Sequence, residues 1–177
     1  DGTKMYLLGA DNNTIYQFSL STAWAVSTAS YDSVSFSHSS QSTVEQGLFF
    51  KPDGTKFYMV DNNGNIYQYS MSTSWNLSTA SYDSVSYTSL GNAKGITFNS
   101  EGNTFLLAIG DSTDYIKEYT LSTAWNISTA SPTGSTFDVG AQTNDPNNIV
   151  LSNNDTSLYI ISSTSHQYSS SLDQEQI

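Results

Sequence analysis

The sequence predicts an all-β protein with the fold of a β-propeller, built from four-stranded antiparallel blades of about 50 residues. Three observations carry this prediction. Three short sequence words recur in one order along the chain, at spacings of 48 to 53 residues. Apolar and aromatic residues gather in short clusters between Ser, Thr, Asn and Gly, as in proteins with many short strands. Asp-Gly and Asn-Gly pairs stand where the chain must reverse. The chain holds about 3.5 to 4 such blades.

The repeated words divide the chain into units. The first word is DGTKMY, and it returns as DGTKFY, EGNTFL and NDTSLY, at residues 1–6, 53–58, 101–106 and 154–159. The second word ends in Trp and reads TIYQFSLSTAW, NIYQYSMSTSW and YIKEYTLSTAW, at 14–24, 65–75 and 115–125. The third, STASYDSVSF, recurs as STASYDSVSY and is reduced to STAS in the third unit, at 27–36, 78–87 and 128–131. The array therefore consists of units 1–46, 47–94, 95–147 and 148–177.

Each unit contains four segments with the pattern of a strand. The first is an apolar run that ends at a turn, at 47–54, 95–102 and 148–155. The second is apolar almost throughout, as expected of a strand packed on both faces, at 3–10, 55–61, 103–110 and 157–162. In the third, aromatic and polar residues alternate, at 15–20, 66–71 and 116–121. The fourth is rich in Ser and aromatic residues, at 30–36, 81–87 and 135–140.

The turn residues support these boundaries and favour a propeller over a solenoid. Asp53-Gly54, Asn63-Gly64 and Glu101-Gly102 lie between successive strands, and the glycines readily adopt the positive φ of tight hairpins. No segment combines helical apolar spacing with helix caps. A unit of about 50 residues with four strands is long for one turn of a β-helix, which is the solenoid alternative.

One segment carries a family resemblance. FKPDGTKFYMVDNNGNIYQYS, at 50–70, resembles the propeller repeats of the YVTN and NHL-like group, which includes lactonase-type propellers. The words SLSTAW and STASYDSVSF are similar to repeats of uncharacterised surface, secreted or phage-encoded proteins. The resemblance covers nearly the whole chain and implies the fold. It does not choose among lactonases, lyases, receptors and adhesins, all of which use such propellers.

Composition excludes several kinds of partner. Sixteen Asp and Glu oppose five Lys, no Arg is present, and the net charge is −11. We expect no nucleic-acid binding, because that affinity comes from cationic side chains that neutralise phosphates. No apolar run reaches the roughly 20 residues of a membrane-spanning helix, so we expect no membrane insertion. The absence of Cys excludes disulfides and thiolate metal sites.

The two ends of the sequence predict self-association. The chain begins inside the first turn, without the apolar strand that precedes the same turn at 47–52, and its last unit stops after a third strand at 166–172. Strand edges that lack a partner can pair with another strand. The chain is therefore expected to be a window of a longer array, to complete a ring between its own ends, or to share one ring between two copies.

A calcium site is the one cofactor that the sequence suggests; otherwise no cofactor is expected. Asp11, Asp61 and Asp111 recur at 50-residue steps and would place a ring of carboxylates on one face of a closed propeller. DNNGN, at 61–65, has oxygen-bearing side chains at alternate positions. Its glycine lies at the wrong place for a standard calcium loop, and no Glu closes it. The competing interpretation is a hairpin turn held by local hydrogen bonds.

The remaining site candidates are aromatic residues and sequons. Trp24, Trp75 and Trp125 occur once per unit and either stack on sugar rings or anchor a long connection. Four sequons place candidate N-glycosylation sites in the chain, at Asn12, Asn76, Asn126 and Asn154. The two histidines, His38 and His166, occupy non-equivalent places in the repeat and are interpreted as surface residues rather than members of a catalytic triad.

These observations favour a non-catalytic β-propeller displayed outside the cell, on the cell surface or on a virion. Such a protein would act as a structural, adhesion or recognition module for carbohydrate or a surface receptor, or as the protomer of a fibre. The alternative is a propeller enzyme of the lactonase or lyase type with its site at the central channel. That alternative requires residues that break the repeat and converge on the axis.

Overall fold

The structure is a computed structural model that describes residues 1–9, 12–89, 91–110, 112–143, 145–152, 154–162 and, for the backbone alone, 168–171. Within these ranges the chain forms fourteen strands, paired antiparallel, and three short 3-10 turns. The all-β prediction is confirmed. None of the helical turns in the described part of the chain is long and apolar enough to cross a membrane.

The strands form four separate sheets of three or four strands, none of which closes on itself among the described residues. We call them blades 1 to 4 in chain order. Blade 1 holds β1 (Lys4–Gly9), β2 (Thr14–Leu20) and β3 (Ala29–Ser37); blade 2 holds β4 (Glu45–Phe50), β5 (Lys56–Asp61), β6 (Asn65–Met71) and β7 (Ala80–Thr88); blade 3 holds β8 (Ala93–Phe98), β9 (Thr104–Ile109), β10 (Tyr115–Leu121) and β11 (Ala130–Asp138); blade 4 holds β12 (Pro146–Leu151), β13 (Ser157–Ser162) and β14 (Tyr168–Ser171).

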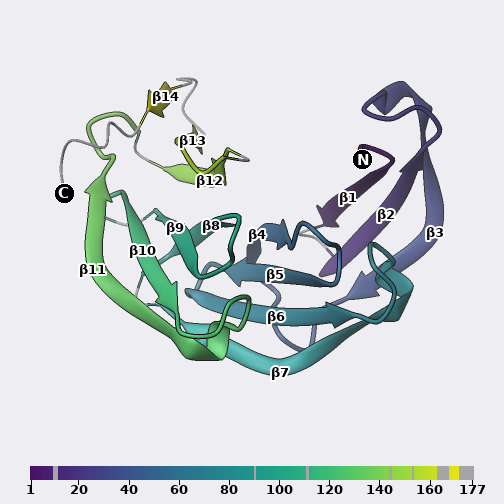
Figure 1. The fold of residues 1–177 in the computed structure, drawn as a ribbon, viewed down its shortest axis with the longest axis horizontal. Coiled ribbons are helices and arrows are strands. Elements are labelled where there is room, and N and C mark those ends of the chain that lie inside the picture. Colours follow the sequence, from purple (N-terminus) through teal and green to yellow (C-terminus); the bar gives the residue numbers. More distant parts are fainter. Residues whose placement is uncertain are drawn as a thin grey trace.

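The blades follow one another along an arc that is open between blade 1 and blade 4 (Figure 1). The first strands of blades 2 to 4, β4, β8 and β12, lie along the inside of the arc, and β3, β7 and β11 form its outside. This is the arrangement of blades in a propeller. The fourth strand of the third unit is longer than the sequence predicted, because β11 begins at Ala130 directly after a 3-10 turn.

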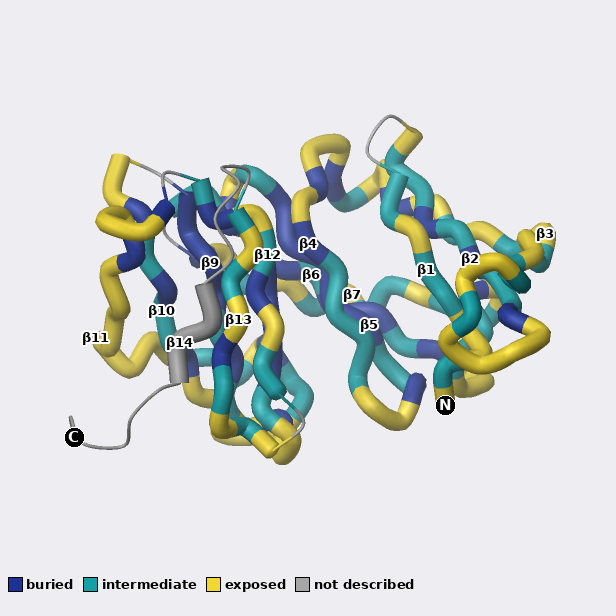
Figure 2. The backbone as a smooth tube through the Cα atoms, turned by 90° about the horizontal axis from the view of Figure 1, so that it is seen from above, coloured by how far each residue is buried: buried dark blue, intermediate teal, exposed yellow. Residues whose placement is uncertain are grey.

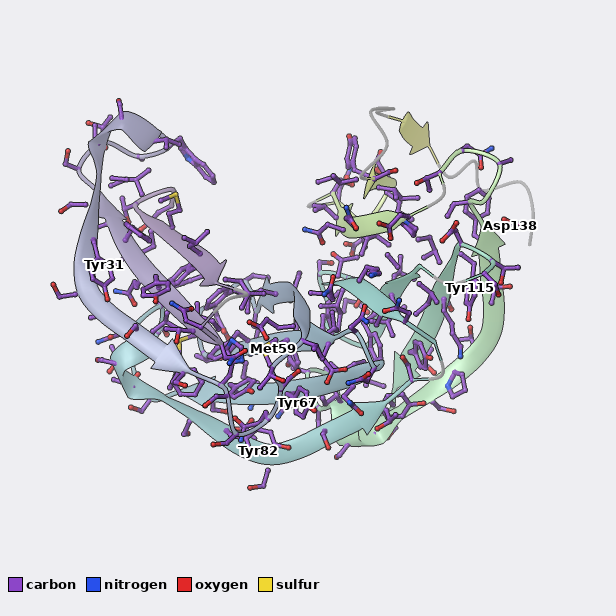
Figure 3. All side chains as sticks on the ribbon, turned by 180° about the vertical axis from the view of Figure 1, so that it is seen from behind. Tyr31, Met59, Tyr67, Tyr82, Tyr115 and Asp138 are labelled. Carbon is purple, nitrogen blue, oxygen red and sulfur yellow. The ribbon has the colours of Figure 1, made fainter. Side chains whose placement is uncertain are left out.

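Most of the core lies on the two faces of blade 2. Phe57 and Met59 of β5 pack toward blade 1, and the alternating residues Tyr58 and Val60 pack toward blade 3. All four side chains are fully buried. Figure 2 shows mostly buried residues along β5 and β9, and Figure 3 places Met59 in the interior, with Tyr31 and Tyr82 on the outer strands.

Glycines let the inner strands approach one another. A Cβ atom on Gly47 of β4 would lie 2.9 Å from the main-chain oxygen of Lys94 in β8. A Cβ atom on Gly95 of β8 would likewise lie 2.8 Å from the Asn148 Cα of β12. Only glycine fits at both positions, so the three inner strands pack closely along the inside of the arc.

A tryptophan locks the long connection of each of blades 1 to 3 onto its own blade. Trp125 has a φ of 62° and donates its main-chain N–H to the Gly102 carbonyl at 2.8 Å. Its indole covers Gly102 so closely that a Cβ atom there would lie 2.0 Å from the Trp125 Cε2. Trp24 on Gly2 and Trp75 on Gly54 repeat this arrangement.

A 3-10 turn follows each tryptophan, and the second and third of these turns fasten their blade to the preceding one. These turns are η1 (Val26–Thr28), η2 (Leu77–Thr79) and η3 (Ile127–Thr129). The Gln68 side chain of blade 2 accepts a hydrogen bond from the Ile127 N–H of blade 3, while its amide group donates to Asp83 in its own blade. Gln17 accepts from Leu77 N–H in the same way. Leu77 and Ile127 are buried by these contacts, which is worth about 1.5–3 kcal/mol for each side chain.

Candidate functional site

The inner strands carry the residues that depart from the repeat. When the units are aligned, Gln46 of β4, Lys94 of β8 and Asn147 of β12 occupy one position. All three are polar, all differ, and all reach solvent at least in part. None of these three residues was among the site candidates predicted from the sequence. Divergent polar residues on the inner strands are what the enzyme alternative requires.

Lys94 is the centre of a polar cluster that joins three blades. Its Nζ donates to Asn62 Oδ1, in the turn after β5, at 3.1 Å. A Cβ atom on Gly110, at the end of β9, would lie 3.2 Å from Lys94 Cε and 3.1 Å from Asp145 Oδ1, just before β12. The Lys94 and Asp145 side chains therefore both lie against the same glycine. We call Asn62, Lys94 and Asp145 the rim cluster. It combines a cation, a carboxylate and an amide.

Two pockets open along the inner strands. One of about 330 Å³ lies between β1 and β4 and includes Gln46 and Gly47 of β4 with Asn148 of β12. A second, of about 620 Å³, extends over the other half of the inner strands, from Phe50 to Asn99 and Asp155. Both volumes are within the range of small-molecule sites. The inside of the arc therefore offers room for a small ligand, and Gln46 is the repeat-breaking residue that lines one of these two pockets.

His38 is buried, so its interpretation as a surface histidine is wrong. Its side chain and that of Glu45 are both fully inaccessible, and His38 Nε2 lies 3.8 Å from Glu45 Oε1. His38 aligns with Ser89 and Val139 of the later units, which are also buried. Burial lowers the pKa of His38, and the nearby Glu45 carboxylate partly opposes that shift. His166 lies outside the described residues.

The His38–Glu45 pair supports the inner strand rather than facing a ligand. The His38 carbonyl accepts hydrogen bonds from the N–H groups of Gln41 and Ser42, which form a tight turn. Glu45 directly precedes Gln46, which lines the smaller pocket. Neither side chain is accessible to solvent. The pair therefore holds the start of β4 in place.

Of the three aspartates predicted to bind calcium, only Asp61 lies within the described residues, and Asp11 and Asp111 do not. The Asp61 carboxylate accepts hydrogen bonds from the N–H groups of Asn63 and Asn65 at 3.0 and 2.8 Å, and from the Asn65 amide and the Tyr67 hydroxyl. This is the hairpin turn that the sequence offered as the competing interpretation. Across the described ranges, no three His, Asp or Glu side chains gather as a metal site.

Trp75 and Trp125 lie between blades, whereas Trp24 is exposed and lines, together with Trp75, a pocket of about 330 Å³. Trp75 stacks on Phe50 and Tyr6, with ring centroids 5.9 and 6.4 Å apart. Trp125 stacks on Phe98 at 5.3 Å. Trp24 has the same backbone conformation, yet its side chain is 81% exposed. The geometry of Trp75 and Trp125 is that of packing anchors.

The asparagines of the sequons hold local turns. Asn76 and Asn126 cap η2 and η3, where each side chain accepts a hydrogen bond from the N–H two residues later. Asn154 accepts from the Ser152 and Thr156 hydroxyls, and Asn12 donates to the Tyr16 hydroxyl. Capping gives Asn76 and Asn126 a structural reason to recur at one repeat position. Glycosylation of these four residues stays a prediction.

Comparison with known proteins shows the fold. No protein-family model and no curated protein matches the sequence. Among solved structures, a putative 6-phosphogluconolactonase from Bacteroides uniformis matches with a TM-score of 0.66 and 13% identity over 98% of this chain and 48% of its own. A putative 6-phosphogluconolactonase from Bacteroides fragilis matches with a TM-score of 0.58 and 12% identity, over 96% of this chain and 51% of its own. A chain of the mitotic checkpoint complex matches with a TM-score of 0.59 and 10% identity, over 96% of this chain and 45% of its own. The present chain thus spans about half the length of these structures.

These comparisons correct the functional expectation. The chain was expected to be a non-catalytic, extracellular adhesion or structural module and not an enzyme. Two of the similar structures are described as lactonases, so the alternative interpretation, a propeller enzyme of the lactonase type, fits the comparison better. The enzyme alternative requires residues that break the repeat, and the inner strands carry such residues at Gln46, Lys94 and Asn147. At 10–13% identity the likeness shows the β-propeller-like fold alone.

Proposed function

We propose that this chain forms part of a β-propeller enzyme that hydrolyses lactones, with its site on the inner strands β4, β8 and β12. The observation that carries the proposal is the rim cluster, in which Lys94 and Asp145 converge over Gly110 from two blades. The fold shared with the two 6-phosphogluconolactonase structures supports it. In the complete β-propeller, these strands would surround the central channel.

The rim cluster has the groups that ester hydrolysis needs. Asp145 takes a proton from a water molecule, whose oxygen attacks the lactone carbonyl carbon. The Lys94 ammonium stabilises the negative charge that develops on the carbonyl oxygen. The tetrahedral intermediate then collapses, the bond to the ring oxygen breaks, and that oxygen receives the proton held by Asp145. The product is an open-chain hydroxy acid. The Asn62 side chain positions the Lys94 amine through their hydrogen bond.

The charge of the chain favours an uncharged sugar lactone over a phosphorylated one. The net charge is −11, with five lysines and no arginine to offset it. A phosphate ester adds nearly two negative charges at pH 7 and is usually held by several cationic donors. Within the described residues, Lys94 is the lysine of the rim cluster, and Lys4 beside the smaller pocket is paired with Asp32 at 2.8 Å. The site is therefore suited to a neutral ring.

Titration of released acid tests the proposal. D-Glucono-δ-lactone is added to the purified chain at pH 7, and base consumption is compared with the spontaneous rate. A saturable rate above the spontaneous one is expected, and Asp145→Asn should remove it. Asp138→Asn is the matched control, because Asp138 is exposed on the outer strand β11 and should leave the rate unchanged. A rate that never exceeds the spontaneous one rejects the proposal.

A further inference from the structure

A β-bulge interrupts the first strand of blades 2, 3 and 4 at the same place. In β4 the register shifts between Glu45 and Gly47, which leaves Gln46 without a partner in β5. The register of β8 shifts in the same way around Lys94, and that of β12 around Asn147. Bulges are common next to active sites, where they turn a side chain in a new direction. The three inner residues that differ between the units are thus the three bulged residues.

The bulge makes each of these residues more accessible than its neighbours in the strand. Gln46 is exposed between two buried residues, and Lys94 is half-buried between two buried residues. Asn147 is exposed and directly follows the buried Pro146. The flanking residues therefore keep the strand packed, while the bulged side chain is free to vary. One bulged residue, Gln46, lines the smaller pocket on the inner strands.

The three bulges lie side by side across neighbouring inner strands. A Cβ atom on Gly47, which follows the bulge of β4, would lie 2.9 Å from the main-chain oxygen of Lys94. The same contact repeats one strand further on, where a Cβ atom on Gly95 would lie 2.8 Å from the Asn148 Cα. The strands β4, β8 and β12 follow one another along the inside of the arc (Figure 1). We call Gln46, Lys94 and Asn147 the bulge row.

The bulge row has an amide on the strand at each side of an ammonium group. Among the described residues, the Gln46 and Asn147 side chains form no hydrogen bond, whereas Lys94 donates one to Asn62. A primary amide is both a donor and an acceptor, as a hydroxyl is, so two free amides suit a ring that carries several hydroxyls. Lys94 and the Asp145 carboxylate lie against the same glycine, so their charges balance and a neutral ring fits the row.

We propose that Gln46 and Asn147 select the substrate by binding the hydroxyls of a polyhydroxylated lactone ring, while Lys94 meets its carbonyl oxygen. The inference rests on the proposed function for the reaction, but binding of the ring can be measured without any reaction. An unsubstituted lactone of the same ring size displaces water from both amides and offers them no partner in return. It should therefore be a poor substrate.

Two lactones test this selection. D-Glucono-δ-lactone and δ-valerolactone share a six-membered ring, and only the first carries hydroxyls. Relative to the spontaneous rates, kcat/KM of the wild type should be at least about 100-fold higher for the hydroxylated lactone. Gln46→Met and Asn147→Leu nearly keep the side-chain volume and remove the amide. Each should lower this preference about 10-fold, mainly by raising KM for D-glucono-δ-lactone.

Gln142→Met is the matched control for these variants. Gln142 is an exposed glutamine of the connection between β11 and β12, outside the inner strands, and its replacement should keep the wild-type preference. Circular dichroism checks that each variant is folded. A wild type that hydrolyses both lactones equally well relative to the spontaneous rates would overturn the inference and leave the proposed function standing.

The binding of lactams separates the inference from the proposed function. D-Glucono-δ-lactam keeps the ring hydroxyls and resists hydrolysis. Calorimetry should show that it binds the wild type, that δ-valerolactam does not, and that Gln46→Met and Asn147→Leu bind it about 10-fold more weakly. This pattern without any lactone hydrolysis would reject the proposed function and keep the inference. Equal binding of the two lactams, no binding of either, or unchanged binding by both variants would overturn the inference.

Discussion

The Tyr58 hydroxyl donates a hydrogen bond to the Trp125 main-chain carbonyl at 2.7 Å, across the boundary between blades 2 and 3. Tyr6 and Trp75 form the same bond between blades 1 and 2. In each case the tryptophan belongs to the connection that covers the glycine of its own first turn. The bond therefore ties the second strand of one blade to the most constrained connection of the next.

Replacing Tyr58 by Phe should lower the free energy of unfolding by about 1 kcal/mol, because the partly buried Trp125 carbonyl loses its donor. Burial raises the pKa of Tyr58, so its hydroxyl remains a donor throughout the neutral range. Urea unfolding measures the change. Tyr31→Phe is the control, because Tyr31 is 46% exposed and should be neutral. An equal free energy of unfolding for Tyr58→Phe and the wild type would show that this hydrogen bond does not stabilise the contact between blades 2 and 3.

Replacing Gly102 by Ala should destabilise the chain far more than replacing Gly134 by Ala. Both glycines have positive φ, 69° and 87°, so both substitutions strain the backbone. Only at Gly102 would the new methyl group meet the Trp125 ring, since nothing lies within 4 Å of a Cβ atom at Gly134. The free energy of unfolding should fall by about 1–3 kcal/mol more in Gly102→Ala than in Gly134→Ala, because that is the usual cost of overpacking. Similar thermal midpoints for the two variants would refute the role of the tryptophan lock.

The stability of the chain should fall as the pH drops below about 6.5, because of His38. The buried His38 has a lowered pKa, so between that value and 6.5 the unfolded chain binds a proton that the folded chain does not. The stability that comes from His38 is thus fully present above pH 6.5, and it declines as the pH falls from 6.5 toward the lowered pKa of the folded state. Urea midpoints at pH 7.5 and 5.5 should differ in the wild type and in His166→Gln, and differ less in His38→Asn. An equal difference between the two urea midpoints in all three proteins would contradict the role of His38.

The repeat allowed the sequence to predict most of the fold. The signals are local, such as the turn pair Asp53-Gly54 and the alternation of aromatic and polar residues at 66–71. Each recurs several times, so a strand that is poorly marked in one unit is identified from its counterpart in another. The burial of His38 was missed because polarity alone suggested the surface. Its counterpart Val139 was a usable signal, since a valine at that position indicates a buried site.

The rim cluster could not be assembled from the sequence. Asn62 and Lys94 lie at distant positions of the unit 47–94, and Asp145 lies in the unit 95–147. Only the packing of blade on blade brings Lys94 and Asp145 to Gly110 and Asn62 to Lys94. The available hint was that Lys94 stands where the other units have Gln46 and Asn147. Long-range contacts of this kind depend on the angle between blades, which no local pattern records.

The central claim is that the rim cluster catalyses lactone hydrolysis, and Lys94→Met tests it most directly. Met keeps the apolar stem over Gly110 and removes only the charge that would stabilise the developing oxyanion. The rate of D-glucono-δ-lactone hydrolysis above background should fall about 100-fold or more. Lys117→Met is the matched control, because Lys117 lies on β10 with its Nζ 5.3 Å from the Tyr119 ring centroid, and it should keep the wild-type rate. Equal rates for the two variants would contradict the account.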